Sequence, residues 1–194
     1  MKIAILASEG APYVKSGGLG DVMEALPAAL ARIPGNEVTL ILPYYKKILE
    51  NPKYEVEQVT QFHVSLGWRQ QYAGVYALKN RTDGVQVYFI DSLYYFGGRD
   101  GAIYGDIDDG ERYAFFSKAC LDALVALDKI PDVIQCNDWQ TALVPVFIKS
   151  QYYPFSTSPR SCTPSTMWSI RAGLPLTSLT MFCVCPGSTA AYWI

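Results

Sequence analysis

Residues 1–22 have the sequence MKIAILASEGAPYVKSGGLGDV. The short apolar run over 2–7 is typical of a buried parallel strand, and a loop with several glycines leads from it into a segment with helical spacing over 20–33. A Pro-Gly-Asn stop signal ends that helix, and an apolar run over 37–42 predicts a second strand. The opening of the chain therefore predicts a strand–helix–strand unit with a right-handed crossover. Pro27 lies inside the helical segment and predicts a kink or a split there.

The chain continues to alternate between strand-like and helix-like patterns. Strands are expected at 56–66, 71–78, 85–90 and 133–136, a long loop at 94–110, and helices at 111–127 and 139–149. The first two of these strands suggest a hairpin. Strands that alternate with helices predict an α/β fold, with a Rossmann-like, doubly wound, mostly parallel sheet.

Composition limits the class of protein. The 194 residues are 50% hydrophobic and carry a formal net charge of −2, which suits one α/β domain with a real core and gives no basic surface for nucleic acid or anionic lipid. No apolar run approaches the roughly 20 residues of a transmembrane helix, and the N-terminus lacks the features of a signal peptide. We therefore expect a cytoplasmic protein with no nucleic-acid partner and no membrane partner.

A first candidate site is the stretch KSGGLGDV at 15–22, between the first expected strand and helix. Glycines there let the backbone approach a ligand closely, and a helix N-terminus suits a diphosphate. Lys15 adds a positive charge. A tight turn with a solvated lysine has the same pattern, so both interpretations stay open from the residues alone. The spacing matches neither the dinucleotide fingerprint nor a Walker A loop, which disfavours NAD(P)-dependent and ATPase functions.

A second candidate is NDWQTAL at 137–143, which follows an expected strand at the edge where α/β sheets bind ligands. Asp138 could orient a sugar hydroxyl or stabilise positive charge at a reacting carbon, although capping the next helix is its simpler role. The acids at 106–111 begin a helix, where negative charge is favourable, and we prefer that interpretation to a metal site. A single histidine and the cysteine spacing also give no metal-binding pattern.

These motifs together resemble the bacterial starch/glycogen synthases, glycosyltransferases that use ADP-glucose. The resemblance covers residues 1 to about 155. The matching segments are the opening strand with Ser8, Glu9 and Pro12, and residues 15–22, 104–117 and 137–145. Ser16 and Asn137 depart from the pattern, because many members have threonine and histidine at those positions.

The resemblance implies the N-terminal half of a two-domain, GT-B type enzyme. Such an enzyme transfers glucose from ADP-glucose to the non-reducing end of an α-1,4-glucan, glycogen or starch, with retention of configuration and without a metal or cofactor. The resemblance places Asp138 in a catalytic position on the sugar side of the cleft. The substrate-binding residues that it implies are Lys15, Gly17, Gly18, Glu9 and Asp21.

The C-terminal domain of such an enzyme supplies most nucleotide contacts, and nothing after Ser150 resembles it. We therefore expect this chain to be inactive alone. Two alternatives remain: a non-catalytic glucan- or nucleotide-binding fragment, and a UDP-glucose-dependent relative.

The composition changes near residue 150. All 18 acidic residues precede it, and residues 151–194 contain no lysine. Read one base earlier, 164–171 can encode Thr-Ile-His-Asn-Val-Glu-Tyr-Gln, which resembles the family's next segment, and the single codons of Met167 and Trp168 force the valine. We hypothesise a synthase domain at 1–155, incomplete, followed at 156–194 by a frameshift product with no predicted domain. The sheet is then expected to end in an open edge.

Overall fold

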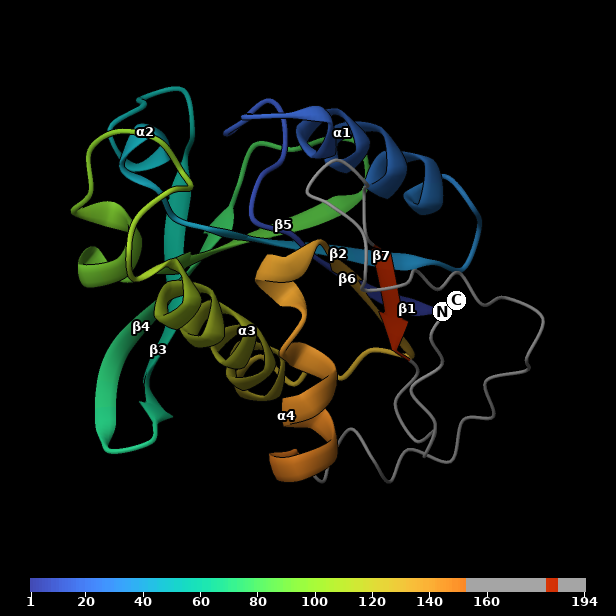
Figure 1. The fold of residues 1–194 in the computed structure, drawn as a ribbon. Helices are drawn as coiled ribbons and strands as arrows, with labels where there is room; N and C mark the ends of the chain where they lie inside the picture. The colour runs from blue at the N-terminus through green and yellow to red at the C-terminus, as the bar shows by residue number, and fades with distance from the viewer. Residues whose placement is uncertain (153–180, 185–194) are drawn as a thin grey trace.

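The computed structural model describes residues 1–152 and 181–184 (Figure 1). Its elements, in chain order, are β1 (Lys2–Leu6), α1 (Gly18–Ala31), β2 (Glu37–Pro43), α2 (Lys46–Leu49), β3 (Val56–Leu66), β4 (Arg69–Leu78), β5 (Val85–Asp91), the π-helical turn η1 (Leu93–Gly97), α3 (Asp109–Ala126), β6 (Val133–Asn137), the 3₁₀ turn η2 (Trp139–Thr141), α4 (Val144–Gln151) and β7 (Met181–Val184).

One sheet of seven strands runs through the molecule in the order β3-β4-β5-β2-β1-β6-β7. The four strands β5, β2, β1 and β6 are parallel. The expected hairpin is confirmed: β3 and β4 pair antiparallel, and β4 pairs antiparallel with β5. The predicted α/β class, with a doubly wound sheet whose centre is parallel, is therefore confirmed.

Helices lie on both sides of this sheet, with α1 on one side and α3 and α4 on the other (Figure 1). The connection β1–α1–β2 moves along the sheet in one direction, and β5–α3–β6 moves in the other. Right-handed crossovers in opposite directions place their helices on opposite faces. The direction changes between β1 and β6, so the loops that leave these two strands diverge and open a crevice at their carboxyl ends.

The central strands are buried on both faces, which explains their apolar runs. In β1, Ile5 and Leu6 have no exposed surface, and neither do Leu40 in β2 and Phe89 in β5. Burial of such side chains is the main favourable contribution to folding. It holds the strand ends in place, so the loops that leave them start from fixed positions.

Two helix predictions involve a proline: the single helix over 139–149 was wrong, and of the kink or split expected at Pro27 the split is absent. The helix α1 continues through Pro27 without a split, and the proline ring is buried together with Leu19 and Met23. The single helix expected over 139–149 is instead the turn η2 followed by α4, with Pro145 in the first turn of α4. Proline lacks the N–H that a continuing helix requires and suits the first turn of a new one.

The expected open edge beyond β6 was also wrong. β7 pairs antiparallel with β6, from Asn137 opposite Met181 to Ile134 opposite Val184. The other residues of the hypothesised frameshift product, 156–180 and 185–194, lie outside the described residues, so that hypothesis stays a prediction. Among the helices that the structure describes, none has the length and apolar character needed to cross a membrane.

Candidate functional site

The candidate site lies where β1 and β6 end side by side. The loop 7–17 leaves β1, and Asp138 follows β6. The buried side chain of Asn137 joins the two strand ends, because its Nδ2 donates to the carbonyl oxygen of Leu6 at 2.9 Å. The two motifs that the sequence singled out are far apart along the chain, but each follows one of these two neighbouring strands, at the crevice that the sheet topology creates.

Glu9 is a buried carboxylate that holds the glycine corner, residues 15–20, in shape. Its side chain is only 2% exposed, and Oε2 accepts hydrogen bonds from the backbone N–H groups of Ser16 and Gly17, the latter at 3.2 Å. A carboxylate at this end of α1 also interacts favourably with the helix dipole. Glu9 therefore contributes to the corner through the backbone, and contact with a substrate remains a proposal.

The corner itself is open to solvent. Gly17 and Gly18 are exposed, and a Cβ added at Gly18 would meet no heavy atom within 4 Å. Gly17 is the N-cap residue of α1 and makes no side-chain capping hydrogen bond. The first N–H groups of the helix can therefore donate hydrogen bonds to a ligand or to water. Gly20 is different, since an added Cβ would lie 2.7 Å from Cγ of Lys15. Gly18 leaves room for a ligand, whereas Gly20 leaves room for the lysine stem.

Lys15 and Asp21 form an ion pair at the mouth of this corner. Nζ of Lys15 lies 2.6 and 2.7 Å from the two carboxylate oxygens of Asp21, and the side chains are 48% and 61% exposed. An ion pair this exposed contributes about 0–1 kcal/mol to stability. The ammonium group can therefore leave Asp21 for an anionic ligand at little energetic cost.

Asp138 begins the turn after β6 with a φ of 63°. Its Oδ1 accepts a hydrogen bond from the N–H of Trp139 at 2.8 Å, which confirms the predicted cap, although it caps the single turn η2. With ψ at −178°, Asp138 lies in a backbone region that is populated almost only by glycine, so its conformation is strained. Oγ1 of Thr141 donates to the carbonyl of Asn137 at 2.9 Å and helps to fix this turn. A catalytic role for Asp138 remains a proposal.

Tyr104 contacts the loop that leaves β1, and the sequence did not reveal this contact. Its hydroxyl lies 2.7 Å from Oγ of Ser8. Burial raises the pKa of Tyr104 most, and the negative charges of Glu9 and Asp138 raise it further. Both carboxylates are therefore within electrostatic reach of one phenol. The resemblance covered Tyr104 as a matching position, but only the folded chain shows its place.

Two further tyrosines support the loop behind Ser8. The Tyr45 hydroxyl donates to the carbonyl oxygen of Ser8 at 2.9 Å, and the Tyr113 hydroxyl donates to that of Ile103 at 2.7 Å. The two hydroxyls lie 2.9 Å apart. This buried chain of hydroxyls joins β1, α2 and α3 just behind the crevice, so the loop 7–17 rests on a rigid base.

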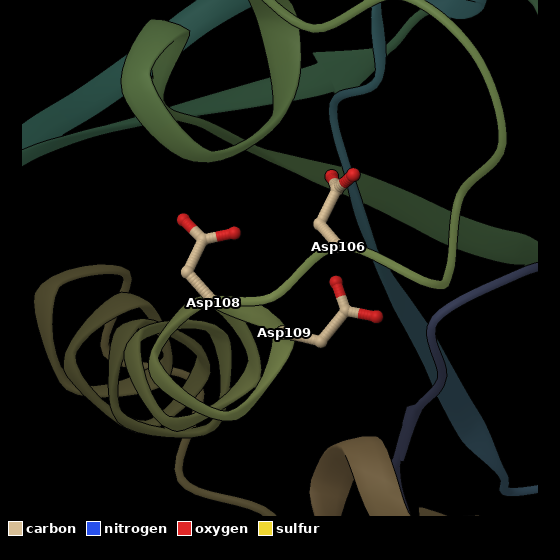
Figure 2. Close-up of side chains that lie close together, drawn as sticks. All are labelled: Asp106, Asp108 and Asp109. Atoms are coloured by element: carbon tan, nitrogen blue, oxygen red, sulfur yellow. The ribbon is translucent and has the colours of Figure 1, made fainter.

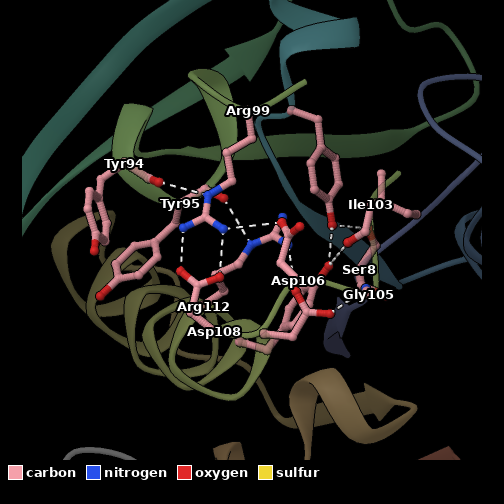
Figure 3. Close-up of polar contacts among 12 residues, drawn as sticks. Ser8, Tyr94, Tyr95, Arg99, Ile103, Gly105, Asp106, Asp108 and Arg112 are labelled. Carbon is pink, nitrogen blue, oxygen red and sulfur yellow. Dashed lines mark hydrogen bonds and ion pairs between the residues drawn. The ribbon is translucent and has the colours of Figure 1, made fainter. Parts of the chain in front are cut away.

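The three aspartates at the start of α3 lie close enough to hold a cation. Figure 2 shows Asp106, Asp108 and Asp109 where the loop enters the helix, and one carboxylate oxygen of each lies within 4.8 Å of the others. Each one is already paired with Arg99 or Arg112 (Figure 3). A cation would have to displace these arginines, so the cluster fits the helix-start interpretation better than a metal site.

Comparison with known proteins connects this geometry to a family. A family model described as the starch synthase catalytic domain matches residues 2–167. The chain belongs to the starch synthase catalytic domain family. The resemblance seen in the motifs is thus confirmed, and so is the inference that the family is one of enzymes.

Glycogen synthases of two bacteria illustrate how much of the synthase the chain represents. That of Exiguobacterium sibiricum is 49% identical over 154 residues, which are 78% of this chain and 31% of that protein. That of Streptococcus pneumoniae strain CGSP14 is 47% identical over 152 residues, again 78% of this chain and 31% of that protein. The chain therefore spans about a third of the length of these relatives.

A solved structure agrees with the fold. The catalytic domain of starch synthase IV from Arabidopsis thaliana, bound to ADP and acarbose, matches with a TM-score of 0.67 and 31% identity. The match covers 79% of this chain and 31% of that chain. The predicted placement in the N-terminal part of a larger synthase is consistent with these shares.

Proposed function

We propose that the whole protein transfers glucose from ADP-glucose to the non-reducing end of an α-1,4-glucan, with retention and without a metal or cofactor. This chain supplies one wall of the cleft. The observation that carries the proposal is the open glycine corner, built on buried Glu9 at the crevice between β1 and β6. The names of the relatives, and the ADP and acarbose in the plant structure, support the two substrates. The expected cytoplasmic location is part of this proposal.

The corner is suited to a sugar diphosphate. Backbone N–H groups at the N-terminus of α1 stabilise negative charge, and Gly18 leaves the space for an oxygen to approach them. The ammonium group of Lys15 adds a charge-assisted contact once it leaves Asp21. In this proposal Lys15, Gly17 and Gly18 bind the donor, and Asp21 holds the lysine ready when the site is empty.

Asp138 and Glu9 are suited to the sugar side. Departure of the diphosphate leaves positive charge at the anomeric carbon, and a fixed carboxylate nearby stabilises that charge. Asp138 is partly exposed at the strand end, with Oδ1 held by the N–H of Trp139, which leaves its other oxygen free for such a contact. Because Tyr104 is in the field of both carboxylates, the two acids act on one region of the crevice.

Binding of ADP-glucose tests the corner. Calorimetry is performed on the chain, on Gly18→Ala and on Lys15→Ala, with Lys47→Ala, an exposed lysine on α2, as the control. We expect Gly18→Ala and Lys15→Ala to weaken binding about tenfold, the effect of about 1.4 kcal/mol, and Lys47→Ala to leave it unchanged. Equal affinity in all four proteins would remove the corner from the site.

Two other functions are distinguished by calorimetry with maltooligosaccharide and with UDP-glucose. A fragment that only binds its ligands would take up ADP-glucose or maltooligosaccharide as tightly as a complete synthase does. A UDP-glucose-dependent relative would prefer UDP-glucose to ADP-glucose once the nucleotide-binding domain is present. The sequence at 15–22 favours ADP-glucose, because KSGGL follows the first strand as it does in that branch of the family.

A further inference from the structure

Two buried residues at the end of the turn 10–14 come directly before the exposed part of the glycine corner. Tyr13 is 8% exposed and Val14 is 6% exposed, whereas residues 15–18 are exposed. Lys15 therefore projects from the point at which the chain leaves the core. Any movement of the two buried residues also moves the base of the lysine side chain.

The backbone of this turn is fixed locally and is joined to α1. Gly10 and Val14 form a bridge in which each N–H donates to the carbonyl of the other, at 2.9 and 3.1 Å. The N–H of Ala11 donates to the carbonyl of Gly20 at 3.0 Å, and the stem of Lys15 lies against the same glycine. These contacts set the shape of the turn, but its hold on the sheet depends on side chains.

Tyr13 connects the turn to the core in two ways. Its ring lies 5.2 Å from the ring of Tyr54 and 5.3 Å from that of Phe89 in β5, and phenylalanine could make these contacts equally well. Its hydroxyl accepts a hydrogen bond from Nη1 of Arg81 at 2.9 Å. A buried tyrosine hydroxyl usually has a partner, and a bond from a charged donor is stronger than one between neutral groups.

Arg81 is itself held in place, so it can act as a rigid support. Its Nε and Nη2 donate to the two carboxylate oxygens of Asp83 at 2.6 and 2.5 Å. The two side chains are 12% and 32% exposed. Oδ1 of Asp83 also accepts from the N–H of Val85 at 3.2 Å, and Val85 is the first residue of β5. The Tyr13 hydroxyl is thus connected through two side chains to the backbone of the sheet.

A second tyrosine supports the same turn independently. The hydroxyl of Tyr54 donates to the carbonyl of Pro12 at 2.8 Å. Loss of the Tyr13 hydroxyl would leave this bond and the ring packing in place. We therefore expect Tyr13→Phe to fold, with the turn loosened but still docked on the core.

We propose that Tyr13 is a positioning residue for the sugar-nucleotide donor. Its hydroxyl, held by Arg81, fixes the turn from which Lys15 projects and so keeps the ammonium group beside the glycine corner. The ligand rests on the proposed function, whereas the support of the turn rests on the contacts of Tyr13 and Arg81. A binding site whose charged group is held in place before the ligand arrives loses less freedom on binding.

Calorimetry with ADP-glucose on a double-mutant cycle tests whether Tyr13 acts through Lys15. We expect Tyr13→Phe to weaken binding about fivefold, equivalent to about 1 kcal/mol, and to have no further effect in a chain that already carries Lys15→Ala. Arg81→Gln removes the same hydrogen bond and is expected to act alike. Tyr152→Phe is the matched control, because Tyr152 is also 8% exposed and its hydroxyl donates to Asp122 at 2.7 Å, beside α3 and α4.

The outcomes of this cycle separate the inference from the proposed function. Equal weakening by Tyr13→Phe with and without Lys15 would overturn the positioning role. Unchanged affinity in Tyr13→Phe beside weakened binding in Lys15→Ala would overturn it too, and would leave the proposed function intact. Unchanged affinity in Lys15→Ala, or no binding by the wild-type chain, would remove the proposed donor site and the positioning role with it.

Hydrogen exchange measured by mass spectrometry tests the support of the turn without a ligand. The N–H groups of Tyr13 and Val14 both donate to the carbonyl of Gly10, so loosening of the turn exposes them. We expect about fivefold faster exchange in the peptide that covers 10–20 in Tyr13→Phe, and no change there in Tyr152→Phe. Unchanged exchange, or an equal increase throughout the chain, would show that the hydroxyl does not hold this turn and would overturn the proposal.

Discussion

Gly18 and Gly20 lie two positions apart in α1 and have opposite surroundings. At Gly20 an added methyl group would lie 3.0 and 2.7 Å from Cβ and Cγ of Lys15. These atoms are near the backbone, so the lysine cannot relieve the overlap by moving only the end of its side chain. We expect Gly20→Ala to lower the free energy of unfolding by about 1–3 kcal/mol, measured by urea denaturation.

Gly18→Ala is the control for this prediction. The space around Gly18 is open, and alanine favours a helix more than glycine does, so we expect unchanged or slightly greater stability. A large loss of stability in Gly18→Ala, or none in Gly20→Ala, would contradict the assigned packing. Together with the calorimetry described above, the pair separates a glycine kept for a ligand from one kept for Lys15.

Asp91 is a buried acid at the end of β5, and its Oδ1 has no hydrogen-bond partner among the residues that the structure describes. Burial raises the pKa of its carboxyl above the ordinary value. As the pH rises, the Asp91 carboxyl therefore ionises in the unfolded chain before it does so in the folded chain. The folded chain loses stability between the unfolded pKa of this carboxyl, about 3.9, and its higher folded pKa. Nearby Tyr44 and Tyr76 have raised pKa values of their own, so they remain neutral across this range.

Asp91→Asn is expected to remove that loss. The variant should be more stable than the wild-type chain at pH 7, and the difference should shrink towards pH about 3, where the carboxyl of the wild-type chain is mostly protonated in both states. Urea denaturation at both pH values measures it. A difference that grows as the pH falls would mean that the carboxylate is stabilised in the folded chain.

At the scale of elements, Arg112 joins η1, the following loop and α3 (Figure 3). It is 1% exposed, its Nε donates to the carbonyl of Tyr95 at 3.0 Å, and Nη1 contacts Asp106 at 2.9 Å and Asp109 at 2.6 Å. Removal of Arg112 leaves the carboxylate of Asp109 without its arginine, whereas Asp106 keeps Arg99. We expect Arg112→Met to lower the free energy of unfolding by about 2–3 kcal/mol.

Arg99→Met is the comparison for this prediction. Arg99 shares Asp106 with Arg112 and also pairs with Asp108, from a side chain that is 24% exposed, so we expect a loss of about 1 kcal/mol or less. Thermal unfolding of both variants measures the difference. Equal losses would indicate that burial does not set the contribution of these ion pairs.

Elements that depend on local pattern could be predicted from the sequence. The strands β1, β2 and β5 are mostly apolar, and the β3–β4 hairpin alternates, so each was found within a few residues. The prolines show where pattern fails. Pro145 lies in the first turn of α4, where the predicted helix ran straight through it, whereas Pro27 lies inside α1 and does not end it, because packing against the sheet holds that helix. The sequence alone does not reveal which of these two effects is larger.

The site was predicted only where its residues are close in sequence. Lys15, Gly18 and Asp21 belong to one short motif, and Asp138 belongs to another, so both could be recognised. Tyr104 lies far from both motifs along the chain, and its contact with Ser8 exists only after α3 has packed. The role of Glu9 was also hidden, because its partners are backbone N–H groups, which no residue pattern identifies.

At the scale of the whole molecule, the fold presents one face of a crevice. The glycine corner and Asp138 both lie at the carboxyl ends of parallel strands, and the corner is open to solvent. Transfer of a sugar requires a site that excludes water and stabilises the departing diphosphate. Since the chain spans 31% of the relatives' length, we propose that the opposing wall comes from sequence that this chain lacks.

The last prediction concerns the reading frame near the codon for Phe155. If residues 156–194 are a frameshift product, restoration of one base there should return Thr-Ile-His-Asn-Val-Glu-Tyr-Gln in place of 164–171 and continue into a second domain. We expect the restored protein to transfer glucose from ADP-glucose to glycogen, and the 194-residue chain to show no turnover in the same assay. Resequencing of the gene decides the premise: an intact frame for the present tail, with no synthase sequence in another frame, would refute it. Turnover by the 194-residue chain would show instead that one wall is sufficient.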